Sequence, residues 1–138
     1  MKNKIMIIAS IMAISSNELS AQTGEELFNN KCSFCHSTSR PADMSKVTAP
    51  AIMGVMRHIK MSYPDKDKAI SFMKDYILNP SMDKAICMPQ KIKRFGVMPS
   101  QKGLVTEKEL DIILPWIYDK FPPKSFRGMR EGRGMGQK

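Results

Sequence analysis

Hydrophobic residues along this chain recur mostly at the three- and four-residue spacing of an α-helix. The longest apolar stripe lies within residues 65–78, with lysines on the opposite face. Another spans residues 107–121 and follows a capping box made by Thr106 and Glu109. Shorter helices are expected at 24–31 and 50–59, with single turns at 83–87 and 89–95. Because no segment alternates apolar and polar residues, we predict an all-α fold of about four to five helices.

The two ends of the chain do not follow this pattern. Lys2 and Lys4 precede an almost wholly apolar run at residues 5–14. This order is typical of a secretory signal peptide, with Ala21 as the last residue removed. The apolar run is short for a membrane span, although an uncleaved anchor is the alternative interpretation. We therefore predict that residues 1–21 direct export to the periplasm.

Positive charge is concentrated toward the C-terminus. The 138-residue chain carries a net charge of +9, with 22 Lys and Arg against 13 Asp and Glu. Residues 122–138 are rich in Gly, Arg and Met and lack periodicity, so we expect a disordered basic tail. Such a tail can steer an acidic partner or touch an anionic membrane surface, or it can be a solvated terminus. We expect no nucleic-acid partner.

The sequence Cys32-Ser33-Phe34-Cys35-His36 holds the most specific chemistry in the chain. Two cysteines separated by two residues and followed by histidine are the attachment motif of c-type haem. On one helical turn both cysteines reach one porphyrin, and the imidazole of His36 can ligate its iron. A redox dithiol needs a βαβ context that we do not find. A zinc site needs a second ligand pair, for which only the distant Cys87 and His58 remain.

Residues 22–121 resemble a class I monohaem c-type cytochrome. The match rests on four features that occur in the family's order. They are the Gly24 to Phe28 segment before CxxCH, the Ala49 to Gly54 segment, the Gly96 to Pro99 segment, and a capped last helix with Trp116 and Tyr118. Ala49 replaces the family's usual glycine, and Pro115 is unusual inside the last helix. The resemblance implies one covalently bound haem c, wrapped by the helices of a small cytochrome c fold.

The resemblance also implies the remaining site residues. Met98, which precedes a proline and follows Gly96 by two positions, corresponds to the distal iron ligand opposite His36. Met88, His58 or an open sixth position are the alternatives. The carbonyl of Pro50 would accept a hydrogen bond from His36 and orient its ring.

The function expected from this resemblance is periplasmic electron transfer. With both axial positions filled, no substrate meets the iron, so we expect no enzyme activity and no catalytic residue. The partners would be redox proteins with acidic docking surfaces. Two other functions stay open: a permanent cytochrome subunit of a larger dehydrogenase or oxidase, or a haem-based gas or redox sensor. Gly24, Phe28 and Trp116 would join the first and last helices, and the odd cysteine, Cys87, is expected to be buried.

Overall fold

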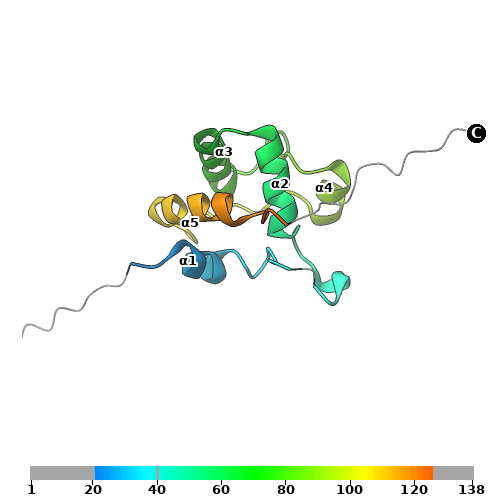
Figure 1. Cartoon of the computed structure of the whole chain (residues 1–138). Helices are drawn as coiled ribbons and strands as arrows, with labels where there is room; N and C mark the ends of the chain where they lie inside the picture. The colour runs from blue at the N-terminus through cyan, green and yellow to red at the C-terminus, as the bar shows by residue number, and fades with distance from the viewer. Residues whose placement is uncertain (1–20, 40, 126–138) are drawn as a thin grey trace, which may run out of the picture.

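A computed structural model describes residues 21–39 and 41–125 of the chain (Figure 1). This part folds into five α-helices and one short 3₁₀ helix and contains no strand, which confirms the predicted all-α class. The α-helices are α1 (Gly24–Lys31), α2 (Ile52–Ser62), α3 (Lys66–Leu78), α4 (Pro89–Phe95) and α5 (Glu107–Lys120). The expected signal peptide, except Ala21, and residues 126–138 of the basic tail lie outside the described residues.

The first and last helices pack directly against each other, as predicted (Figure 1). Gly24 is buried at their contact, and a Cβ atom there would lie 2.7 Å from Cγ of Trp116. Only glycine therefore permits this separation of the two helices. The rings of Phe28 and Trp116 lie next to it, with centroids 5.5 Å apart, and Phe121 completes the aromatic cluster.

Local sequence explains why both helices begin where they do. Thr23 accepts a hydrogen bond from the backbone of Glu26, whose carboxylate bonds back to the Thr23 N–H at 2.8 Å. Thr106 and Glu109 form the same reciprocal arrangement at the start of α5. Each box satisfies amide groups that have no partner inside the helix.

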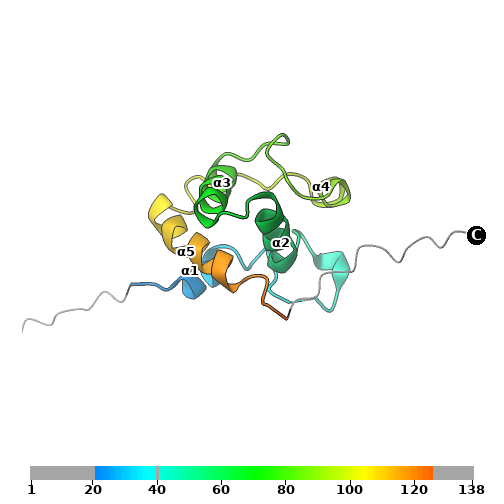
Figure 2. The same cartoon turned by 45° about the horizontal axis from the view of Figure 1, so that its top comes forward.

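Helices α2 and α3 complete the core on the other side of α5 (Figure 2). Helix α3 packs against both α5 and α2, while α4 lies apart from the α1–α5 pair in both views. The predicted apolar faces supply the core. Its buried members include Leu27, Phe28, Ile52, Met56, Ile59, Ala69, Met73, Leu110, Ile113, Leu114 and Ile117.

The irregular segments differ in detail from the prediction. The loop between the CxxCH motif and α2 contains a 3₁₀ helix, Met44–Lys46. Helix α2 begins at Ile52 rather than Pro50 and runs three residues beyond the expected end, to Ser62. The turn expected at 83–87 is a hydrogen-bonded turn at 82–84 instead. The second turn, expected at 89–95, is the seven-residue helix α4 over the same residues.

None of the helices in the described residues is both long and apolar enough to cross a bilayer.

Candidate functional site

The CxxCH segment forms a compact turn at the end of α1. The N–H of Cys32 donates to the carbonyl of Phe28 at 2.8 Å, and the N–H of His36 donates to the carbonyl of Cys32 at 2.9 Å. These bonds continue the helical hydrogen-bond pattern past Lys31, so one turn carries both cysteines and the histidine. Cys32 is half-buried against the core, whereas Cys35 is exposed.

The thiol of Cys32 lacks the property that makes a redox dithiol reactive. Both cysteines are free, and burial, followed by the neighbouring Cys35, raises the pKa of Cys32 to about 11. Redox dithiols are activated by a lowered pKa, because the thiolate is the attacking species. Cys32 therefore stays protonated at neutral pH, which weakens the alternative of a thioredoxin-like site.

The geometry of His36 matches the orientation predicted for it. Its Nδ1 lies 2.8 Å from the carbonyl oxygen of Pro50. Because a carbonyl only accepts, Nδ1 must carry the proton, and Nε2 keeps its lone pair. Burial lowers the pKa of His36, with the bond to Pro50 acting in the opposite direction. The imidazole is therefore neutral at pH 7, which is the form that ligates metals.

A second bond holds the loop that connects these residues. The N–H of Ile52 donates to the carbonyl of Ser37 at 3.0 Å, beside the bond between His36 and Pro50. The two ends of the loop from Ser37 to Ala51 are thereby fastened together. The oxygen of Pro50 consequently has a fixed position relative to the imidazole ring.

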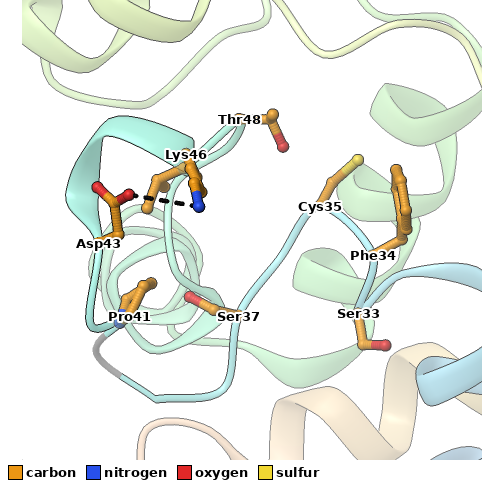
Figure 3. A pocket seen from close by; sticks show the side chains of 9 residues that line it. Ser33, Phe34, Cys35, Ser37, Pro41, Asp43, Lys46 and Thr48 are labelled. Atoms are coloured by element: carbon orange, nitrogen blue, oxygen red, sulfur yellow. Dashed lines mark ion pairs between the residues drawn. The ribbon is translucent and has the colours of Figure 1, made fainter.

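A small hollow lies beside this turn, between Cys35 and the 3₁₀ helix (Figure 3). Its volume is about 170 Å³, and neither His36 nor Met98 lines it. Pockets for cofactors usually exceed about 300 Å³, so the hollow itself is not a porphyrin site. Ser37 is one of the residues that line it, and its hydroxyl is buried without a hydrogen-bond partner among the described residues.

The Met98 segment, residues 96–101, is an irregular stretch that is fixed at its C-terminal end. It leaves α4 at Gly96, whose φ of 73° is a conformation that favours glycine. Beyond Met98, the hydroxyl of Ser100 donates to the carbonyl of Leu78 at 2.7 Å. The N–H of Gln101 donates to the carbonyl of Ile77 at 3.0 Å. Met98 itself is half-buried, next to the C-terminal end of α3.

Tyr76 is a residue near this segment whose position sequence reasoning missed. Burial raises the pKa of its phenol, and the nearby backbone of Met98 acts in the opposite direction. The phenol of α3 thus faces the segment that carries Met98. In the sequence Tyr76 is one member of an apolar stripe, and its polar oxygen is the only signal that sets it apart.

The other candidates lie elsewhere. Met88 is the N-cap of α4 and is 43% exposed, and His58 is half-buried in α2. Cys87 is half-buried rather than buried, and its burial raises the pKa of its thiol. Within residues 21–39 and 41–125, no three His, Cys, Asp or Glu side chains gather as a metal-binding group. The zinc alternative therefore gains no further ligands from this part of the chain.

Comparison with known proteins shows a relative of this chain in Aquifex aeolicus. The chain is 32% identical over 137 residues to an uncharacterized protein of Aquifex aeolicus (strain VF5), covering 90% of this chain and 89% of that protein. The chain belongs to the same family as this Aquifex protein. No family model matches the chain, and no solved structure matches it.

Proposed function

We propose that this protein is an exported, one-electron carrier that resembles the class I monohaem c-type cytochromes. The observation that carries the proposal is the bond between His36 Nδ1 and the Pro50 oxygen, 2.8 Å long, beside two free cysteines. It presents a neutral imidazole with its Nε2 available, on the same turn as two thiols. That donor set fits haem c.

Four side chains would bind the haem directly. Cys32 and Cys35 would form the two thioether links, and His36 would be the proximal iron ligand. Met98 would be the distal ligand, because it is half-buried on an anchored segment, whereas Met88 is partly exposed at a helix start. The bound haem would supply the ferrous–ferric couple. Pro50 would keep the His36 ring in one orientation and raise its basicity as a ligand.

The packing of the first and last helices agrees with this proposal. Gly24 and the ring of Trp116 hold α1 close to α5, and the CxxCH turn follows α1 directly. The turn therefore has a rigid base, which a covalently attached group requires if its iron ligands are to keep their positions. With side chains at both axial positions, the iron would have no place for a substrate, and the protein would not be an enzyme.

The distribution of charge supports an acidic redox partner. Helices α2 and α4 contain five cationic residues and no acidic one. Most acidic residues of the described part lie on α1, α3 and α5, where several form ion pairs, such as Lys31 with Glu109 and Lys66 with Asp119. The side of the molecule that carries α2 and α4 would thus attract an acidic surface and speed the encounter.

The test is the attachment of haem to the full chain, exported to the periplasm of a host that has the haem-attachment machinery. We expect haem that stays bound after denaturation and acid extraction. Ferric protein should show the weak absorption band at the red end of the visible spectrum that a methionine sulfur ligand produces. Replacing Cys32 and Cys35 by Ala should abolish covalent attachment and leave the chain largely unfolded, because the porphyrin completes a small core.

Cys87→Ala is the matched control, because it removes a cysteine outside the motif. We expect this variant to keep its covalent haem. Wild-type protein that contains no covalent haem under these conditions would refute the proposed function. Unchanged helical circular dichroism in the haem-free double variant would refute the claim that the haem completes the core.

A further inference from the structure

One hydrogen bond joins two segments that are distant in sequence and that both belong to the proposed haem site. Nη2 of Arg94, at the end of α4, donates to the carbonyl oxygen of Met44 at 2.7 Å. Met44 begins the 3₁₀ helix in the middle of the loop between His36 and Pro50. Arg94 precedes Met98 by four residues. The bond therefore connects the loop beside the proximal ligand to the segment of the distal ligand.

The position of the N-terminal end of the Met98 segment depends on the placement of α4. Its C-terminal end is held to α3 by the hydrogen bonds of Ser100 and Gln101. At its N-terminal end the segment begins with Gly96, which has no side chain to pack. Gly96 follows directly after α4, a helix of only seven residues. The main helix contacts of the fold join α1 to α5, α3 to α5 and α2 to α3, so they do not place α4.

Arg94 is suited to hold α4 in place. A guanidinium group is charged at every physiological pH, and a charged donor strengthens a hydrogen bond to a carbonyl. The group also lies over the ring of Phe95, 4.9 Å from its centroid, which restricts the side chain to few orientations. The carbonyl that accepts the bond belongs to a loop whose two ends are themselves tied together, through His36 with Pro50 and Ser37 with Ile52.

We propose that Arg94 is a positioning residue that ties the loop beside His36 to the Met98 segment and so retains Met98 at its ligand position. The inference rests on the proposed function, because it concerns the same site. Without this hydrogen bond, α4 and the N-terminal end of the Met98 segment leave their positions together more often. An external ligand then competes more successfully with the sulfur of Met98.

Imidazole binding to the ferric full-length protein tests this role. In Arg94→Met the tie is lost while the length of the side chain is largely kept. We expect its affinity for imidazole to rise about two- to tenfold, the range that corresponds to one net hydrogen bond. Arg94→Lys can still donate to the Met44 carbonyl, so its imidazole affinity should lie between that of Arg94→Met and that of wild type. Lys93→Met removes the neighbouring charge and leaves the bond from Arg94 to Met44 in place. Its imidazole affinity should equal that of wild type.

Amide hydrogen exchange supplies a readout that does not depend on iron ligation. Arg94→Met should speed exchange both in residues 44–50 and in residues 96–99, whereas Lys93→Met should change neither segment. Unchanged exchange in both segments, or an unchanged imidazole affinity in Arg94→Met with haem attached, would overturn the inference. A wild-type protein without covalent haem would overturn the proposed function and the ligand-holding role, while the exchange result would still decide whether the tie exists.

Discussion

Exchanging glycine for alanine should have opposite effects at two positions of this fold. Gly96 has φ 73° and ψ −169°, a region that residues with a Cβ atom rarely enter. Forcing alanine into it costs about 1–3 kcal/mol of folding free energy. No neighbouring atom lies within 4 Å of the position of the new Cβ, so steric crowding adds nothing to this cost. Gly96→Ala should therefore destabilise the protein by backbone strain alone.

Gly54 is the matched control for this substitution. It lies inside α2, its φ is not positive, and its Cβ position is also free of neighbours within 4 Å. Alanine is the better helix former because it restricts the unfolded chain more than glycine does. Gly54→Ala should therefore stabilise the protein, by up to about 1 kcal/mol.

Thermal and urea unfolding of the full-length protein, with any bound haem in place, measure both effects. In a domain of this size, each kcal/mol changes the Tm by about 4–8 °C. We expect the Tm of Gly96→Ala to fall below that of wild type and the Tm of Gly54→Ala to equal or exceed it. A Gly96→Ala variant as stable as wild type would refute the strain argument, and so would an equal loss of stability in both variants.

Three further predictions concern the distal ligand, the partner and the basic tail. Met98→Ala should keep covalent haem but lose the red absorption band and lower the reduction potential, because a soft thioether is replaced by a harder ligand; if Met88→Ala has these effects instead, Met88 is the distal ligand. Lys93→Glu on α4 should slow electron transfer to an acidic partner at low salt more than Lys108→Glu on α5, measured by stopped flow, with the difference shrinking as salt shortens the Debye length below about 10 Å. Cutting the chain after Pro123 should leave spectrum, potential and Tm unchanged, and a changed potential would show that the tail packs near the haem.

The sequence by itself determined the helices whose causes are local. The capping boxes at Thr23 and Thr106 each use residues three positions apart, so α1 and α5 begin where the sequence predicts. The apolar faces followed from helical periodicity, and the CxxCH spacing predicted two cysteines and a histidine on one turn. These features need no information beyond a few neighbouring residues.

Only the tertiary structure decided features that depend on distant partners. Proline is favoured at the first turn of a helix, yet α2 begins at Ile52, because Pro50 stays outside it with its carbonyl bonded to His36. The approach of Tyr76 to Met98 and the bond from Arg94 to Met44 link residues that are 22 and 50 positions apart. No local propensity encodes such contacts, because they arise only when packing of the helices brings their segments together.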